Sequence, residues 1–227
     1  MAFAVRLGVI TYDAPHLKTE QVVLGLLARG YRFDLWAIPF QARPARQTLI
    51  QHRPAMDDAP HPEALAQHYA LAFDRVADSR HLPTGYDVLL IAGAGLLPAE
   101  VVTKVRTINC HPGLAPAVRG LDAFKWAIYD GQPLGVTLHQ VDVEVDRGMP
   151  LALLRTPVFP DDSLERLARR HYQAEIGLLV DFERWSSRPM APDATLTGRP
   201  ARLRMPLAIE REVLERFDAY KANHAIS

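Results

Sequence analysis

The chain is poor in several features that mark special classes of protein. Its 227 residues include a single cysteine, Cys110, which excludes an intrachain disulfide and fits a reducing compartment. Its 26 Lys and Arg residues match its 26 Asp and Glu residues, and the lack of a basic excess argues against a nucleic-acid or anionic-membrane partner. No segment has the roughly 18 consecutive apolar residues of a membrane helix. The opening residues, MAFAVRLGVITYD, become charged too early for a signal peptide, so we expect a cytoplasmic protein.

What the chain does contain is typical of a globular α/β protein. Apolar residues make up 48% of it, and a chain of this length can bury a substantial core. Residues 5–11 form an apolar run of strand length, residues 17–30 follow a helical pattern, and residues 31–38 alternate like a second strand. This β-α-β order is typical of a parallel sheet.

The alternation of helices and strands continues after an irregular stretch. Residues 39–62 are rich in Pro, Arg and His, and a loop of this length inside a compact domain is usually functional or disordered. Beyond it, the patterns predict helices at residues 63–73, 96–104, 122–131 and 161–185, and strands at residues 86–95, 105–109, 134–141 and 151–158. We therefore expect an α/β fold with a Rossmann-like, mostly parallel twisted sheet and helices on both faces.

A change of composition suggests where the main domain ends. After Trp185 the chain becomes rich in Ser, Pro, Thr, Gly and Arg, which predicts a boundary within residues 186–192. Residues 1–185 then form the main domain, and residues 186–227 form a short C-terminal extension with one helix at residues 207–222.

The most unusual stretch is INCHPG, residues 108–113, where a predicted buried strand ends. Because side chains alternate along a strand, Asn109 and His111 face the same side and Cys110 faces away. Pro and Gly follow at once and turn the chain. Ligands gather at the carboxyl ends of the strands of an open parallel sheet, so Asn109 and His111 lie where a site is expected.

A second loop of chemical interest follows the strand predicted at residues 134–141. It offers Asp142, Glu144 and Asp146. An Asn, a His and an acid suit acyl-group transfer, because the amide can donate to an oxyanion, the imidazole can move a proton, and the carboxylate can orient the imidazole. The same residues also have ordinary interpretations, as a turn-forming Asn, a structural His and a solvated acid.

Two other chemistries find less support. His111, His139 and an acid could bind a metal ion, but the sequence has no HExxH or paired-Cys pattern. A serine nucleophile would be expected in a GxSxG turn, which the sequence lacks. Cys110 is interpreted as a buried filler.

Several motifs together are more specific than any single residue. They are Asn109, His111-Pro112, Arg119-Gly120, Trp126-Ala127-Ile128, Gly135 to His139, and Asp146-Arg147-Gly148, in this order. This series resembles the core signature of the folate-dependent formyltransferases, the family that includes glycinamide ribonucleotide formyltransferase, methionyl-tRNA formyltransferase and the amino-sugar N-formyltransferases. The resemblance extends from Tyr86 to the predicted long helix, and it makes residues 1–185 the expected formyltransferase catalytic domain.

The resemblance implies a role for each matching residue. Asn109, His111 and Asp146 match the family's catalytic trio, and 10-formyltetrahydrofolate is the implied formyl donor. No metal and no covalent enzyme intermediate are implied.

The resemblance also implies a place for the pterin ring of the donor. Two loops are expected to bind it, and their residues are Leu96, Leu97, Asp142, Val143, Glu144 and Val145. Backbone groups of the second loop would read the edge of the pterin.

Departures from the family pattern narrow the choice among the acceptors that this family uses. The loop TYDAPHLKT contains no Gly, whereas glycinamide ribonucleotide formyltransferases carry a Gly- and Ser-rich phosphate loop there. The short segment after Trp185 and the balanced charge disfavour methionyl-tRNA as the acceptor and nucleic acid as a partner. Formyltetrahydrofolate deformylase has a further N-terminal regulatory domain.

The amino-sugar branch therefore looks most similar. It implies a nucleotide-linked amino sugar as the acceptor, a homodimer formed through the C-terminal extension, and a place in lipopolysaccharide biosynthesis. Formylation of another small amine, such as a siderophore hydroxylamine or glycinamide ribonucleotide, stays open, and so does a non-catalytic binding protein.

Basic side chains are the candidates for contacts with the acceptor. Arg119, Lys125 and Arg53 are the predicted residues, and Arg43, Arg46 and His52 accompany Arg53 in the long loop. Arginine suits the diphosphate of a nucleotide, although solvated loop charges are an equal interpretation. Trp126 lies on a predicted helix and is interpreted as a core residue.

Overall fold

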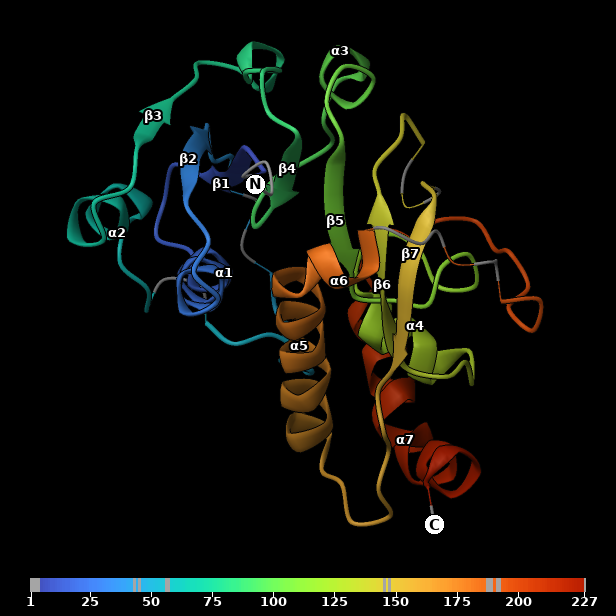
Figure 1. Ribbon diagram of the computed structural model, residues 1–227. Helices are drawn as coiled ribbons and strands as arrows, with labels where there is room; N and C mark the ends of the chain where they lie inside the picture. The colour runs from blue at the N-terminus through green and yellow to red at the C-terminus, as the bar shows by residue number, and fades with distance from the viewer. Residues whose placement is uncertain are drawn as a thin grey trace. The chain divides into compact units, whose positions relative to one another are not determined.

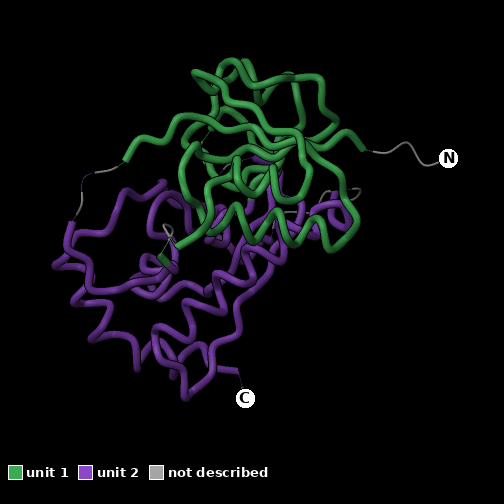
Figure 2. Tube along the Cα trace, turned by 90° about the vertical axis from the view of Figure 1, so that its left-hand side faces the viewer, with its two compact units in different colours: residues 1–43, 55–109, 140–144 green, residues 44–54, 110–139, 145–227 purple. Residues whose placement is uncertain are grey.

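The chain divides into two compact units, shown in different colours in Figure 2. The computed structural model describes residues 5–42, 44, 46–55, 58–144, 146, 148–186, 190 and 193–226. The first unit contains residues 1–43, 55–109 and 140–144, and the second contains residues 44–54, 110–139 and 145–227. The boundary predicted at residues 186–192 lies partly outside the described residues and stays a prediction.

The first unit alternates strands and helices along the chain. Its elements are β1 (Leu7–Tyr12), α1 (Leu17–Ala28), β2 (Phe33–Ile38), α2 (Pro62–His68), β3 (Phe73–Arg75), a 3₁₀ turn (Ser79–His81), β4 (Val88–Ile91), α3 (Ala99–Val102) and most of β5 (Thr107–His111).

The second unit contains most of the longer helices. Its elements are α4 (Ala123–Tyr129), β6 (Gly135–Gln140), β7 (Pro150–Arg155), α5 (Leu164–Val180), α6 (Phe182–Ser186) and α7 (Leu207–His224).

The strands form one sheet of seven in the order β3-β2-β1-β4-β5-β6-β7 (Figure 1). β1 pairs in parallel with β2 and β4, β2 with β3, and β4 with β5, whereas β7 runs antiparallel to β6. The predicted mostly parallel α/β sheet is therefore confirmed. Because β1 lies between β2 and β4, the strand order reverses at β1, which is the kind of switch point where open sheets bind ligands.

The sheet of the first unit is covered on both faces. Ile10 and Leu89 belong to a buried cluster that includes Val101 of α3. The next residue of β1, Thr11, points the other way and its hydroxyl bonds that of Thr19 on α1. Helices thus lie against both faces, as the sequence predicts for a buried parallel sheet.

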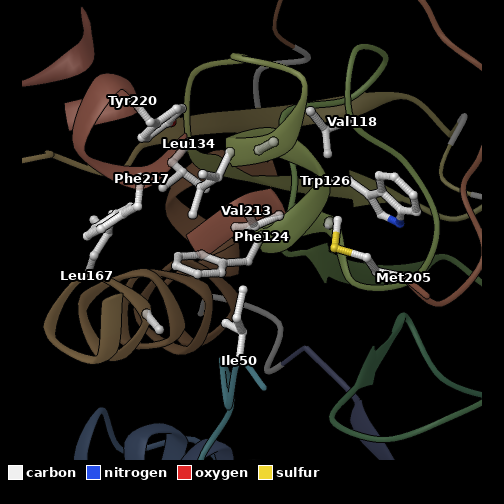
Figure 3. Packing of buried hydrophobic residues seen from close by; sticks show 14 of the residues in the cluster. Ile50, Val118, Phe124, Trp126, Leu134, Leu167, Met205, Val213, Phe217 and Tyr220 are labelled. Carbon is white, nitrogen blue, oxygen red and sulfur yellow. The ribbon is translucent and has the colours of Figure 1, made fainter. Parts of the chain in front are cut away.

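The core of the second unit is arranged around α4 (Figure 3). Phe124 and Trp126 of this helix are buried among side chains from α5 and α7, including Leu167 and Phe217. The C-terminal helix α7 is therefore an integral part of this core. Trp126 is buried, as predicted, and its indole N–H donates to the carbonyl of Leu203 at 2.8 Å.

Several predicted elements were too long. The strand predicted at residues 86–95 is only Val88–Ile91, and the helix predicted at residues 96–104 is only Ala99–Val102. The helix predicted at residues 63–73 ends at His68, because Ala70 adopts φ 52° and the Leu71 N–H caps the carbonyl of Ala66. The residues that follow then form β3, which the sequence did not predict. The helix predicted at residues 161–185 is interrupted at Asp181, which separates α5 from α6.

Within the part of the chain that the structure describes, none of the helices has both the length and the apolar character that crossing a membrane requires.

Candidate active site

The INCHPG stretch contains the end of β5, which extends beyond the strand predicted at residues 105–109. Strand β5 ends at His111, with Cys110 fully buried and Asn109 half-buried two residues before the histidine. The alternation of a strand therefore puts Asn109 and His111 on one side of β5.

The ring of His111 is held through both of its nitrogen atoms. Nε2 lies 3.0 Å from the carbonyl oxygen of Val118, and Nδ1 lies 3.3 Å from Oδ1 of Asp146. Gly113 makes the first contact possible, because a Cβ there would lie 2.5 Å from the Val118 oxygen and 2.7 Å from Nε2. The Gly of INCHPG is thus required by close packing around the histidine.

These contacts fix where the protons of His111 are. A carbonyl oxygen can only accept a hydrogen bond, so Nε2 carries a hydrogen. Nδ1 then bonds Asp146 only when a further proton lies between the two groups. Burial lowers the pKa of His111, while the negative charge of Asp146 acts in the opposite direction. The pair is therefore suited to take up and release one proton.

Asp146 is itself held by the backbone of a neighbouring loop. It adopts a left-handed conformation with φ 49°, and its Oδ2 accepts the N–H of Gly120 at 3.0 Å. Gly120 has φ 88°, and a Cβ there would collide with the carbonyl oxygen of Arg202. The Gly of the Arg-Gly motif is thus fixed between the carboxylate and the 193–205 segment.

The Gly-x-Thr-x-His motif supports the loop that follows His111. The hydroxyl of Thr137 donates to the carbonyl of Gly113 at 2.7 Å and accepts the N–H of Ala115 at 3.0 Å. Gly135 leaves room for Leu114, whose side chain would lie 2.6 Å from a Cβ at that position. These motif residues therefore hold the backbone beside the histidine in place.

A second buried histidine supports the same loop from α5. Nε2 of His171 lies 3.2 Å from the carbonyl oxygen of Pro112, the residue after His111, and Nδ1 lies 2.8 Å from the hydroxyl of Thr156. Burial lowers the pKa of His171 to about 4, so the ring is neutral near pH 7. Nε2 then donates to Pro112 and Nδ1 accepts from Thr156.

The residues predicted to bind the pterin belong to the first unit where they are described. Leu96 is 78% exposed and Val143 is 66% exposed. Leu97 packs partly against the buried cluster of α3. Oδ1 of Asp142 accepts the N–H of Glu144 at 2.8 Å and shapes the second loop. Val145 lies outside the described residues.

The residues predicted to contact the acceptor all make contacts within the protein. Arg119 donates to the carbonyl of Arg199, at 2.7 Å from Nη2. Lys125 is buried, and its ammonium lies 2.7 Å from Glu210, which gives it a structural contact. Arg53 pairs with the buried Glu175 at 2.8 Å and keeps a partly exposed side chain. Their predicted contacts with an acceptor remain predictions.

Two residues near the site, His171 and Glu175, were not predicted from the sequence. Both lie on the buried stripe of α5, four residues apart and in line with Leu167. Polar residues at such positions of an otherwise apolar stripe are the signal that could have identified them.

Among the described residues we find no candidate metal centre. No group of three or more His, Cys, Asp or Glu side chains in that part of the chain is placed to hold a metal ion.

The geometry of β5 and Asp146 defines a class of chemistry. A buried His paired with a partly buried Asp, able to carry one proton and preceded by an Asn amide on the same strand, is suited to acyl-group transfer. The family model for formyl transferases matches residues 41–182. The chain therefore belongs to the formyl transferase family.

Known proteins of this family act on several acceptors. The methionyl-tRNA formyltransferase of Burkholderia orbicola is 32% identical over 160 residues, which cover 67% of this chain and 48% of the relative. The chain thus spans about half the length of the curated relatives it matches.

Solved structures share the fold. A sugar N-formyltransferase from a Shewanella species gives a TM-score of 0.59 at 22% identity, covering 88% of this chain and 76% of that chain. A phosphoribosylglycinamide formyltransferase from Anaplasma phagocytophilum gives 0.57 at 26% identity, with 78% and 83% covered. The formyltransferase PseJ from Anoxybacillus kamchatkensis, solved with a formamido sugar nucleotide and tetrahydrofolate, gives 0.51 at 16% identity, with 71% and 90% covered.

Proposed function

We propose that this protein transfers the formyl group of 10-formyltetrahydrofolate to the primary amine of a small acceptor. The observation that carries the proposal is the His111–Asp146 contact beside Asn109, in a chain of the formyl transferase family. The side chains of Leu96 and Val143 fit a role in donor binding, because a bound pterin would cover their exposed apolar surface.

The proposed reaction is a direct displacement. The nitrogen of the neutral amine attacks the formyl carbon and forms a tetrahedral intermediate. Asn109 donates a hydrogen bond to its oxyanion, and His111 stabilises the same negative charge when it is protonated. The bond between the formyl carbon and N10 of the folate then breaks.

The proton of the attacking amine has a defined route in this scheme. It passes to the His111–Asp146 pair, directly or through a water molecule, and then to N10 of the leaving folate. A histidine whose pKa is lowered by burial releases the proton readily. The amide of Gly120 keeps the Asp146 carboxylate in place during both transfers.

We propose a nucleotide-linked amino sugar as the acceptor. The loop after β1, residues 13–16, contains no Gly to cradle a phosphate closely, which disfavours glycinamide ribonucleotide. The 32% identity with methionyl-tRNA formyltransferase supports methionyl-tRNA as a second candidate. The predicted homodimer stays a prediction.

Transfer of isotope-labelled formyl groups tests the proposal. The purified protein receives labelled 10-formyltetrahydrofolate and a set of amines: nucleotide-linked amino sugars, glycinamide ribonucleotide, a hydroxylamine and methionyl-tRNA. We expect a labelled formamide with an amino sugar. A protein that formylates none of these amines would contradict the proposal.

Two variants test the assigned residues in the same assay. His111→Ala and Asp146→Asn should each lower turnover by about 100-fold or more, while the far-ultraviolet circular dichroism stays unchanged. His68→Ala, at the exposed C-terminal end of α2, serves as the control and should keep full turnover. Unchanged turnover in His111→Ala would remove the basis of the assignment.

A further inference from the structure

The first turn of α7 carries a buried carboxylate that belongs to neither the predicted site nor the apolar core. Glu210 has no exposed surface. Its Oε1 lies 2.7 Å from the ammonium of Lys125, which is itself buried. Although burial opposes ionisation, the hydrogen bonds from Lys125 and from two backbone amides hold the pKa of Glu210 below its usual value. The carboxylate is therefore ionised and fully enclosed by donors near pH 7.

The two amides belong to the 46–54 segment, which lies in the predicted long loop. Oε2 of Glu210 accepts the N–H of Leu49 at 2.6 Å and the N–H of Ile50 at 3.1 Å. The 46–54 segment has no helix or strand of its own, so its amides need partners from elsewhere. Glu210 supplies the hydrogen-bond acceptor for the amides of Leu49 and Ile50.

Further contacts hold both ends of the 46–54 segment. Arg46 pairs with Asp122 at 3.0 Å. The ring of His52 stacks on Phe124, with ring centres 6.0 Å apart and planes 6° apart. Ile50 is buried in the core of the second unit, beside Phe124 in Figure 3. The segment is thus anchored at Arg46, Ile50 and His52.

This conformation carries Arg53 to α5. Its guanidinium pairs with Glu175, which lies four residues after His171 on the same helix. His171 in turn bonds the carbonyl of Pro112, next to His111. A guanidinium has five N–H donors in a fixed fork, so the pairing with Glu175 orients Arg53 and still allows it to bind a phosphate.

We propose that Glu210 is a positioning residue: it holds the 46–54 segment in the conformation in which Arg53 binds the diphosphate of a nucleotide-linked acceptor. Glu210 does not touch the acceptor itself. The C-terminal helix then controls acceptor affinity through two backbone hydrogen bonds. This inference rests on the proposed function for its choice of ligand.

The test separates positioning from stability by removing the whole buried ion pair. In the double variant Lys125→Met/Glu210→Met, apolar side chains of similar volume replace two charges, so neither charge is left buried without the other. The amides of Leu49 and Ile50 lose their acceptor, and their hydrogen exchange should accelerate. Glu215→Gln, on the exposed face of α7, is the matched control and should leave that exchange unchanged.

Binding of uridine diphosphate, measured by titration calorimetry, gives the functional readout. We expect the wild type and Glu215→Gln to bind it equally, and the double variant and Arg53→Ala each to bind about 10-fold more weakly. Equal affinity in a folded double variant would overturn the inference, as would a wild type that does not bind uridine diphosphate.

The formyl-transfer assay keeps this inference distinct from the proposed function. Formyl transfer without any effect of the double variant on diphosphate binding refutes the role of Glu210 alone. Weakened diphosphate binding in a protein that formylates none of the amines tested supports the role of Glu210 and refutes formyl transfer.

Discussion

Gly120 lies between the carboxylate of Asp146 and the backbone of Arg202, and it has no room for a side chain. Gly120→Ala should therefore destabilise the protein by about 3 kcal/mol or more, because both the positive φ and the close approach of the Arg202 backbone oppose a Cβ. Turnover should fall as well, since Asp146 loses its amide partner. Urea denaturation and the formyl-transfer assay measure the two effects.

Gly131 provides the matched control for this prediction. It also has a positive φ, 63°, but nothing lies within 4 Å of the position that a Cβ would occupy. Gly131→Ala should thus cost only about 1 kcal/mol, the strain of the left-handed conformation. Equal losses in the two variants would show that the contact with Arg202 contributes nothing.

The buried histidine of α5 makes a prediction about pH. His171 has a pKa of about 4 in the folded protein, below the value near 6.5 expected when unfolded. Between these two values the unfolded state binds more protons, so stability falls as the pH is lowered. His171 should remove about 2 kcal/mol of the unfolding free energy between pH 8 and pH 5.

Urea denaturation of the wild type and of His171→Gln at both pH values isolates this effect. The fall in the unfolding free energy should be smaller in the variant, because glutamine does not titrate. Other titrating groups, among them His52 with its pKa lowered to about 4 by burial and by Arg53 and Lys125, are present in both proteins and contribute to both falls. Identical falls would contradict a buried neutral His171.

At the scale of elements, α7 gives the sharpest contrast between two faces of one helix. Phe217 is buried against α4, whereas Leu214 is 45% exposed. Phe217→Ala should lower the unfolding free energy by about 3 to 4 kcal/mol, because it leaves a cavity in the core of the second unit. Leu214→Ala should cost less than about 1 kcal/mol. Thermal and urea unfolding of both variants measure the difference.

The elements also show what the sequence could predict. The apolar runs of β1 and β5 and the apolar stripe of α5 are clear in the sequence, so these elements could be identified with small errors at their ends, whereas the strand predicted at residues 86–95 is only Val88–Ile91. The end of α2 depends on the left-handed turn at Ala70, and alanine gives no sign of such a turn. The three-residue strand β3 is defined by its parallel pairing with β2, in which Phe73 lies opposite Leu35, and such a tertiary contact leaves no local pattern in the sequence.

The residues of the site also divide into those that the sequence could predict and those that it could not. Asn109, His111 and Asp146 could be predicted because the motif fixes their spacing and chemistry. The contacts of Glu210 with Lys125 and with the amide of Leu49 link residues 85 and 161 positions apart, and no local pattern encodes such distances. For the same reason, the sequence could not show that Lys125 is engaged in a buried ion pair.

At the scale of the whole molecule, the prediction concerns ligand-linked stability. A ligand that binds only the folded state raises its stability by about 2.7 kcal/mol at 100 times its dissociation constant. Thermal unfolding with a folate analogue, alone and together with each nucleotide-linked amino sugar, should therefore reveal the acceptor as an additional rise in the midpoint. A midpoint that is the same with and without every folate analogue would contradict donor binding.

Cys110 offers a means of observing the site without any mutation. Its thiol is the single one in the chain and lies buried between Asn109 and His111. A reagent that reacts with thiols can reach it only when β5 opens, so the rate of modification measures how often the strand that bears the histidine separates from its neighbours. Cys110 has no part in the proposed chemistry, but the rate at which it is modified therefore reports how often Asn109 and His111 move with β5.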